Sequence, residues 1–228
     1  MAREGSVKYL NTAKSGKNDE FYTILSDIEK EMRHYTSHFR SKTVLCNCDD
    51  PRVSNFVKYF LNNFDKLGLK ALITTCYQND KPDLFSQHKA VKGIYFKYHG
   101  EQKAKRLPDP AKVRPVDLEA DGDFRSEECI NLLKEADIVV TNPPFSLFRE
   151  YVAQLVEYRK KFLIIGNWNA ITYKNVFKLI KDDKLWIGVN SNRNFSVPVP
   201  EILTGRIPEI LSGLRKETGD ESREGGGV

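Results

Sequence analysis

The chain has 228 residues, of which 40% are hydrophobic and 29% charged, the composition of an ordinary folded domain rather than a disordered chain. Its apolar runs fall well short of the roughly 18 to 20 residues that a membrane-spanning helix requires. The first residues are polar and contain no apolar signal core. Four cysteines are too few for a small disulfide-stapled scaffold. We therefore expect neither a membrane protein nor a secreted one, and the collagen and coiled-coil classes are excluded.

The net charge is +5, from 36 Lys and Arg against 31 Asp and Glu, which permits a polyanionic partner without requiring one. The charge is uneven, because residues 97–114 contain six basic residues against two acidic ones, together with two prolines. This segment is predicted to form a basic loop. The loop is either a solvated surface or a site that contacts phosphate groups. In the second case Lys103, Lys105 and Arg106 are the candidate contacts.

Short apolar, β-prone runs alternate along the chain with segments of helical spacing. The expected strands are residues 43–47, 70–76, 93–98, 137–141, 161–166 and 185–189. The expected helices are residues 17–39, 53–64, 126–134, 147–158 and 176–181. Apolar strands that alternate with helices predict an α/β fold, a doubly wound and mostly parallel sheet covered on both faces. Ligands bind such sheets where strands release their carboxyl ends into loops.

The chain divides into three expected parts. Residues 1–42 form an N-terminal helical segment, residues 43–199 form the α/β core, and residues 200–228 form a tail. The apolar pattern weakens after Pro200, and the last residues are rich in Gly, Glu and Asp. We therefore expect the tail to be flexible.

One motif carries chemistry, because Asn142, Pro143, Pro144 and Phe145 follow directly on the apolar strand 137–141. An exocyclic amine on a purine is a poor nucleophile, since its lone pair is delocalised into the ring. The Asn142 carboxamide oxygen and the Pro143 carbonyl can accept both hydrogens of such an amine, which favours a pyramidal nitrogen that attacks. The prolines stiffen the turn, and Phe145 offers a flat face on which a base can stack. A stiff turn with a purely structural role is the alternative.

This motif resembles the catalytic tetrapeptide of amino-methyltransferases that use S-adenosylmethionine (AdoMet). Further segments are similar to the EcoRI-type adenine-specific DNA methyltransferase family and run in that family's order. They are Asn18 to Thr23, Cys46 to Pro51, Ser54 to Phe56, Thr75 to Tyr77, Gly122 to Phe124 and Trp186 to Asn190. The resemblance covers roughly residues 7–195 and implies a Rossmann-like methyltransferase fold.

The resemblance also implies AdoMet as the cofactor and a role for individual residues. Those implied to bind AdoMet are Phe21, Tyr22, Thr23, Asn47, Asp49, Asp50, Pro51, Cys76, Tyr77, Asp123 and Phe124. Phe21, Tyr22 and Thr23 would line the methionine end of AdoMet, and the residues from Asn47 to Pro51, after the first strand, would contact its amino-acid portion. Cys76 and Tyr77, after the second strand, would hold the adenosine. Asp123 and Phe124 would bind the edge of its adenine ring. Residues 142–145 would grip the target adenine.

The implied reaction is methyl transfer to the exocyclic N(6) amine of an adenine in duplex DNA, as in restriction-modification. The base must be flipped out of the duplex to reach the motif. Double-stranded DNA, a cognate restriction endonuclease, a monomeric state and a cytoplasmic location in a bacterial or phage-encoded system are implied as well. No metal site is expected, because Cys46 and Cys48 lack the spacing of a zinc knuckle.

Two departures leave alternatives open. The turn after the first strand has no glycine, although most AdoMet enzymes place a glycine-rich turn there. The chain diverges from the family after about Phe195 and stops at Val228, where the family continues into a target-recognition region, so a C-terminally truncated product is expected. The alternatives are a non-catalytic remnant that binds AdoMet or DNA, and a methyltransferase that acts on an amine in RNA or on a protein glutamine.

Overall fold

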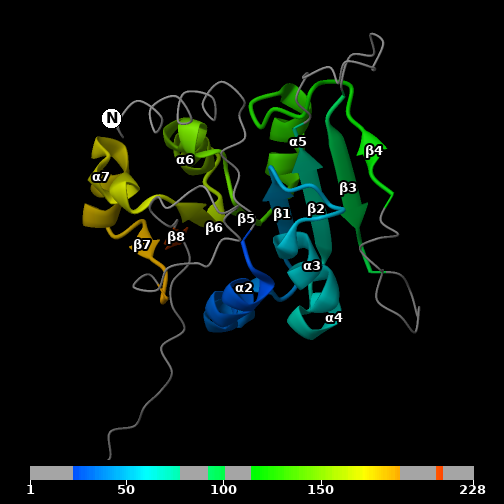
Figure 1. The fold of residues 1–228 in the computed structure, drawn as a ribbon, viewed down its shortest axis with the longest axis horizontal. Coiled ribbons are helices and arrows are strands. Elements are labelled where there is room, and N and C mark those ends of the chain that lie inside the picture. The colour runs from blue at the N-terminus through cyan, green and yellow to red at the C-terminus, as the bar shows by residue number, and fades with distance from the viewer. Residues whose placement is uncertain (1–22, 78–91, 101–113, 191–208, 213–228) are drawn as a thin grey trace, which may run out of the picture.

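The computed structural model describes residues 23–77, 92–100, 114–190 and 209–212. Within these ranges, eight strands form one sheet in the order β4-β3-β2-β1-β5-β6-β8-β7 (Figure 1). The strands are β1 (Thr43–Asn47), β2 (Ala71–Cys76), β3 (Ile94–Tyr98), β4 (Val116–Asp117), β5 (Ile138–Thr141), β6 (Lys161–Gly166), β7 (Trp186–Ile187) and β8 (Glu209–Ser212). The apolar runs of the sequence predict six of these strands and miss the short strands β4 and β8.

The centre of the sheet is parallel, because β1 pairs in parallel with β2 and β5, and β5 pairs in parallel with β6. Strands β3 and β8 run antiparallel to β2 and β6. Strands β4 and β7 run antiparallel to β3 and β8 and so share the direction of the centre. The predicted doubly wound, mostly parallel α/β sheet is confirmed. The chain winds to one side of β1 and later to the other, and ligands bind such folds at the carboxyl ends beside this reversal.

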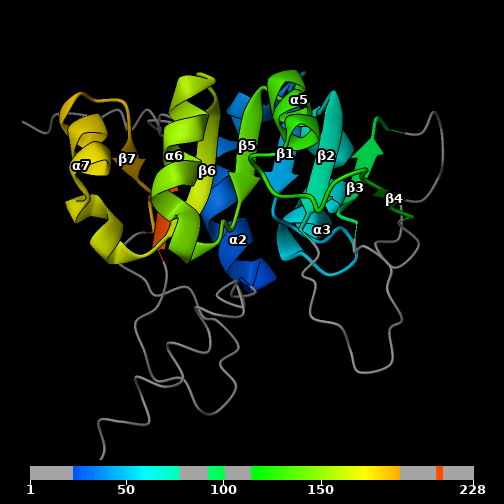
Figure 2. The same ribbon diagram turned by 90° about the horizontal axis from the view of Figure 1, so that it is seen from above.

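Helices cover both faces of the sheet and make a three-layer arrangement (Figure 1 and Figure 2). The described α-helices are α2 (Leu25–Met32), α3 (Asn55–Asn62), α4 (Phe64–Leu67), α5 (Glu127–Glu135), α6 (Phe148–Glu157) and α7 (Lys174–Lys181). The described 3-10 helices are η1 (Arg33–Phe39), η3 (Phe145–Leu147) and η4 (Trp168–Thr172). Helices α2, α3 and α4 pack on one face, and α5, α6 and α7 on the other. None of these helices is long and apolar enough to cross a membrane.

The buried side chains of the strands alternate between two apolar clusters, because successive residues of a strand point to opposite faces. In β1, Val44 and Cys46 pack in the cluster that contains α2 and α3, whereas Leu45 packs in the cluster that contains α5 and α6. The side chains of β5 and β6 alternate in the same way. The central strands are therefore buried on both faces, which explains why they read as continuous apolar runs in the sequence.

Helix α3 begins two residues later than its apolar spacing predicts. The Ser54 hydroxyl accepts the backbone N–H groups of Phe56 and Val57 at 3.1 and 3.4 Å and so caps the helix. Val53, which the spacing places on the buried helical face, precedes this cap and is 43% exposed. The prediction is wrong at that position, because a capping residue ends the helical periodicity.

Both ends of the described chain differ from the sequence-based expectation. The expected helix 17–39 consists, within the described residues, of α2 followed by the 3-10 helix η1. The strand expected at 185–189 is shorter, because only Trp186–Ile187 pairs with β8. Strand β8 lies inside the range 200–228 that the sequence predicts as a tail, yet it pairs with both β6 and β7. Its four residues therefore belong to the sheet.

A buried glutamate ties α2 to the segment that follows β7. The Glu31 side chain is fully buried. One carboxylate oxygen accepts the Tyr35 hydroxyl and the Val189 N–H, each at 2.8 Å. The other accepts the N–H of Asn190 at 2.9 Å and its side-chain amide at 2.7 Å. Four donors therefore converge on one carboxylate and join parts of the chain that lie far apart in the sequence.

Candidate active site

Three turns meet at the carboxyl edge of the sheet, where β1, β2 and β5 end. Asn47 lies opposite Thr75 in the register of β1 and β2, and the Thr75 hydroxyl donates to the Asn47 carboxamide oxygen at 2.6 Å. The N–H of Asp49 donates to the Thr75 carbonyl at 2.9 Å. At the end of β5, the Thr141 hydroxyl lies within hydrogen-bonding distance of the Asn47 carbonyl. Asn47 therefore joins the three strand ends.

Two adjoining hollows open at this edge, with volumes of about 210 and 30 Å³. The larger is lined by Thr23, Cys48, Asp49, Asp50, Ser54, Asn55, Phe56, Cys76, Tyr77 and Asn142. The smaller is lined by Cys48, Tyr77, Gly122, Asp123, Phe124, Pro144 and Leu147. Because Cys48 and Tyr77 line both, the turns after β1 and β2 stand between the two hollows.

The turn after β1 reaches this edge without a glycine. Cys48 has a φ of +74°, in the left-handed region that residues other than glycine seldom adopt. Holding a non-glycine residue there costs about 1–3 kcal/mol. The conformation turns the chain so that the Asp49 N–H points back to β2. A half-buried cysteine therefore takes the place of the glycine that most AdoMet enzymes have in this turn.

Asp49 is buried in the wall of the larger hollow. Its carboxyl group is bound by the Ser54 hydroxyl at 2.6 Å and the Thr141 hydroxyl at 2.5 Å. Burial raises the pKa of Asp49 to about 6, although hydrogen bonds from Ser54, Thr141 and the Asn142 backbone act to lower it. Both of its oxygens are therefore engaged by the chain itself.

Two further carboxylates of the hollows are each bound by an arginine two residues further along the chain. Arg52 donates to Asp50 through Nε at 2.9 Å and Nη2 at 2.6 Å. Arg125 donates to Asp123 through Nε at 2.9 Å and Nη2 at 2.7 Å. Burial acts to raise the pKa of Asp50, but the hydrogen bonds and charge of Arg52 outweigh it and hold this pKa below its ordinary value. Exposed pairs of this kind add little stability, so we expect them mainly to orient the carboxylates.

Gly122 brings Asp123 and Phe124 against the end of β2. Its φ is +82°, and a Cβ at this position would lie 2.6 Å from the Cys76 carbonyl oxygen. Phe124 is buried and packs edge-on against Tyr151 of α6, with ring centroids 5.0 Å apart. Close backbone approach on one side and ring packing on the other therefore fix this wall of the smaller hollow.

We expect the Gly122→Ala variant to lose about 1–3 kcal/mol of unfolding free energy. The added methyl group must adopt a left-handed conformation and also collides with backbone. Gly68→Ala is the matched control, because Gly68 also has a positive φ, but its Cβ would meet only the Arg40 side chain, at 3.7 Å. Denaturant unfolding measures both variants. Equal losses would contradict the assigned collision with Cys76.

The motif 142–145 follows β5 at the same edge. Asn142 is buried and lines the larger hollow, and Pro144 lines the smaller one. Pro143 is buried. Phe145 begins η3, is half-buried and packs against the apolar cluster on the α2–α3 face. The structure therefore brings Asn142 and Pro144 together with the turns that follow β1 and β2.

Some of the residues singled out in the sequence do not line these hollows. Phe21, Tyr22, Lys103, Lys105 and Arg106 lie outside the described residues. Asn47, Pro51, Pro143 and Phe145 are described but line neither hollow.

Sequence reasoning assigns no site role to several residues that do contribute to the hollows. Ser54 is signalled only by its position before a helix, which predicts a cap. The Asn55 side-chain amide donates to the Thr23 carbonyl at 2.7 Å and so holds the residues just before α2 at the hollow. Cys48 lines both hollows, and Thr141 binds Asp49 in the wall of the larger one. The sequence assigns a site role to neither residue, because these roles depend on backbone conformation and strand register.

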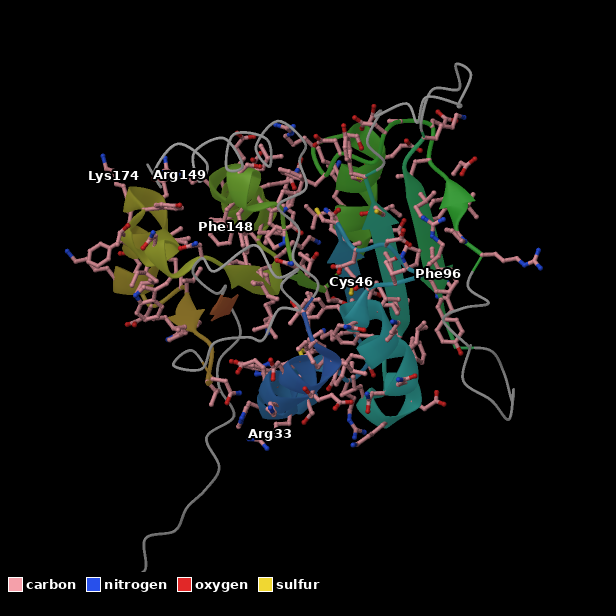
Figure 3. All side chains as sticks on the ribbon, viewed as in Figure 1. Arg33, Cys46, Phe96, Phe148, Arg149 and Lys174 are labelled. Carbon is pink, nitrogen blue, oxygen red and sulfur yellow. The ribbon has the colours of Figure 1, made fainter. Side chains whose placement is uncertain are left out.

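A larger hollow, of about 860 Å³, lies between α6 and α7. Arg149 and Lys174, which line it, lie well away from Cys46 at the centre of the sheet (Figure 3). The Arg149 guanidinium stacks over the Tyr173 ring, 4.1 Å from its centroid. None of the turns after β1, β2 or β5 contributes to this hollow. Its size is therefore weaker evidence for an active site than the position of the smaller hollows at the strand ends.

The chemical groups of the two strand-end hollows fit AdoMet. This molecule has a net positive charge and many hydrogen-bond donors, including an ammonium group, ribose hydroxyls and an adenine amine. Among the described residues, the hollows present the carboxylates of Asp49, Asp50 and Asp123 and no lysine or arginine. An acidic, acceptor-rich surface suits a cationic ligand with many donors. In the described part of the chain, no group of three or more His, Cys, Asp or Glu is arranged to hold a metal ion.

The family described as adenine-specific methyltransferase EcoRI matches residues 9–220. The chain belongs to this family. The match to the EcoRI methyltransferase family extends to residue 220, past the point near Phe195 where the sequence alone predicts divergence. That prediction is therefore corrected, and β8 lies within the matched range.

Three curated proteins related to this family member are Type II methyltransferases by name. The chain is 56% identical over 196 residues to M.EcoRI of Escherichia coli, covering 86% of this chain and 60% of that protein. It is 41% identical over 193 residues to M.MpnI of Mycoplasma pneumoniae, covering 84% and 54%. It is 38% identical over 194 residues to M.MgeORF184P of Mycoplasma genitalium, covering 85% and 55%. The chain thus spans little more than half the length of these relatives, and no solved structure matches it.

Proposed function

We propose that this chain carries the catalytic core of an adenine-specific DNA methyltransferase, which transfers a methyl group from AdoMet to the exocyclic N(6) amine of adenine. The observation that carries the proposal is the position of Asn142, which lines the same hollow as Asp49, Asp50 and Tyr77. A residue suited to activating an amine therefore stands beside a surface suited to a cationic methyl donor. Membership of the EcoRI methyltransferase family supports the proposal.

The hollows would hold the cofactor by charge and by hydrogen bonds. When bound, AdoMet supplies a methyl group on a positively charged sulfur. Asp49 and Asp50 attract this charge from the turn after β1, and Thr23 closes the larger hollow from the N-terminal side. The wall at 122–124 borders the smaller hollow and suits the adenine end of the ligand.

The amine of the target base would be activated at the turn after β5. The Asn142 carboxamide oxygen and the Pro143 carbonyl accept its two hydrogens, which frees the lone pair for attack. The stiffness of Pro143 and Pro144 keeps these acceptors in place during the reaction. Phe145 offers a ring on which the base stacks. A general base is not required, because the proton leaves for solvent after the methyl group has been transferred.

Double-stranded DNA is the proposed partner, with the target adenine flipped out of the helix. The names of the relatives favour DNA over an amine in RNA or a protein glutamine. The basic segment 97–114 contains the proposed phosphate contacts, which position the duplex without reading its sequence. We further propose that the chain acts as a monomer in the cytoplasm and belongs to a restriction-modification system with a cognate endonuclease.

Methyl transfer from labelled AdoMet to unmethylated duplex DNA tests the proposed function. The DNA is digested after the reaction and its nucleosides are separated. We expect label in N(6)-methyladenine and release of S-adenosylhomocysteine at a rate that depends on DNA. AdoMet binding without DNA-dependent turnover would instead identify a non-catalytic remnant. Label in RNA or in a glutamine-containing protein offered in parallel would favour the other amine acceptors.

The double substitution Lys105→Ala with Arg106→Ala is expected to weaken DNA binding at low salt. Each lost phosphate contact lowers the slope of log affinity against log salt by about 1, so we expect the slope to fall by about 2. Fluorescence anisotropy across a salt series measures it. The matched control is Lys66→Ala with Lys70→Ala, two exposed lysines at the opposite edge of the sheet, where β2 begins. An unchanged slope in the test variant would indicate that this loop is a solvated surface that does not contact phosphate groups.

A further inference from the structure

Helix α6 holds the wall of the smaller hollow through three side chains of one face. The Glu150 carboxylate accepts a hydrogen bond from Arg125 Nη1 at 2.8 Å, and the Gln154 side-chain amide donates to the Phe124 carbonyl at 3.1 Å. Between these two contacts, the Tyr151 ring packs edge-on against the Phe124 ring. Residues three and four positions apart share a face of a helix, so the three side chains reach the wall together. Both hydrogen bonds join residues at least 25 positions apart, so the position of the wall depends on tertiary packing.

Arg125 transmits the position of Glu150 to the carboxylate of Asp123. Its guanidinium donates to Asp123 through Nε at 2.9 Å and Nη2 at 2.7 Å, and to Glu150 through Nη1 at 2.8 Å. The same group lies over the Phe124 ring, 5.3 Å from its centroid. A guanidinium is planar and its donors have a fixed geometry, so contacts on two of its sides define its orientation. Glu150 therefore acts on Asp123 through the arginine between them.

The same helix is attached to the catalytic turn. Helix η3 leads directly into α6, and Leu147 is the N-cap of α6. Leu147 and Pro144 line the smaller hollow together with Asp123 and Phe124. The buried face of α6 packs in the apolar cluster on its side of the sheet, which fixes the helix in place. One rigid element therefore sets the position of the wall relative to the turn that carries Asn142.

The polar contacts of α6 contribute little to the stability of the fold. The side chains of Arg125 and Glu150 are 48% and 58% exposed, and exposed ion pairs stabilise a protein only slightly. The Tyr151 hydroxyl and Gln154 Oε1 are buried and make no hydrogen bond within the described residues, which disfavours folding. A leucine at position 154 would avoid burying an amide oxygen, but it could not donate to the Phe124 carbonyl. Packing alone therefore does not account for a glutamine at this position.

We propose that Glu150 and Gln154 are positioning residues for cofactor selectivity, which hold the wall so that Asp123 faces the adenine amine of AdoMet. The inference rests on the proposed function, because it requires AdoMet as the ligand. The adenine amine has two hydrogens that a carboxylate can accept. A wall released from α6 would still border the hollow, but its carboxylate would no longer be aimed at the amine. Loss of either contact should therefore weaken recognition of the amine rather than ligand binding in general.

Competition between two compounds measures this recognition on the full chain. S-adenosylhomocysteine carries the amine, whereas S-inosylhomocysteine carries an oxygen in its place, and each competes with labelled AdoMet in equilibrium binding. We expect the wild type to prefer the adenosyl compound by about 10- to 100-fold, the usual value of a hydrogen bond to a charged group. This preference should fall by about threefold or more in Glu150→Ala and in Gln154→Leu. Glu157→Ala should keep it and is the matched control, because Glu157 is exposed on α6 and lines neither strand-end hollow.

A double-mutant cycle tests whether Glu150 acts through Arg125. We expect Arg125→Ala to lower the preference by itself, and Glu150→Ala to have no further effect in that background. Denaturant unfolding of Glu150→Ala should match that of Glu157→Ala, because both residues are exposed. An equal loss of affinity for both compounds, with the preference unchanged, would identify a purely structural role and overturn the proposal.

The outcomes separate this inference from the proposed function. A wild-type chain without a preference, or variants that keep the wild-type preference, would overturn the role of Glu150 and Gln154 and leave the methylation proposal intact. Absence of any AdoMet binding would overturn both. A preference that falls in Glu150→Ala and Gln154→Leu but not in Glu157→Ala supports the inference, whether or not the chain methylates DNA.

Discussion

The Asn142→Ala variant is expected to turn over about 10²–10³-fold more slowly than the wild type, the usual effect of removing one hydrogen-bonding group aimed at the reacting atoms. AdoMet affinity should stay within a few-fold. The bond between the Asn142 N–H and the Asp49 carboxyl uses backbone, so the substitution leaves it in place. The expected loss therefore falls on kcat, since only the acceptor for the target amine is removed.

Single-turnover methyl transfer and equilibrium AdoMet binding, measured on the same preparations, test this prediction. Asn131→Ala is the matched control, because Asn131 is exposed on α5 and lines neither strand-end hollow. It should behave as wild type in both measurements. Wild-type turnover in Asn142→Ala would remove Asn142 from the mechanism, whereas loss of AdoMet binding would reassign it to the cofactor.

The Glu31→Ala variant is expected to lose about 3 kcal/mol or more of unfolding free energy. Its buried carboxylate accepts the Tyr35 hydroxyl and three N–H groups from Val189 and Asn190. Removing it leaves the buried Tyr35 hydroxyl without an acceptor, at a cost of about 1–3 kcal/mol, and takes a charged acceptor from three part-buried N–H groups. Glu31→Gln should also destabilise the chain, because an amide nitrogen then faces N–H groups.

Denaturant unfolding of these variants measures the loss, with Glu29→Gln as the control on the exposed side of α2. A double-mutant cycle of Glu31→Ala with Asn190→Ala isolates the bond between the two side chains. Additive losses would contradict the assigned coupling. Because Thr23 lies just before α2 and lines the larger hollow, the Glu31 variants should also bind AdoMet more weakly than Glu29→Gln.

Local pattern was enough to predict the architecture. The central strands are buried on both faces, so their apolar runs are unbroken and easily located. The sequence does not predict strands β4 and β8, because both residues of β4 are exposed and β8 lies in a range where the apolar pattern is weak. The motif 142–145 can also be recognised from the sequence alone. Two prolines and an aromatic residue after an apolar strand are local features, and the chemistry they suggest requires no distant partner.

The sequence by itself therefore determined the doubly wound sheet, the edge at which the candidate site is proposed and the turn that carries Asn142. Only the tertiary structure decided how that turn is held. The left-handed conformation of Cys48, the Thr141 hydroxyl shared between Asn47 and Asp49, and the four donors on Glu31 all depend on register between distant segments. Periodicity reports which face of an element is buried, whereas a hydrogen-bond partner is chosen by three-dimensional proximity.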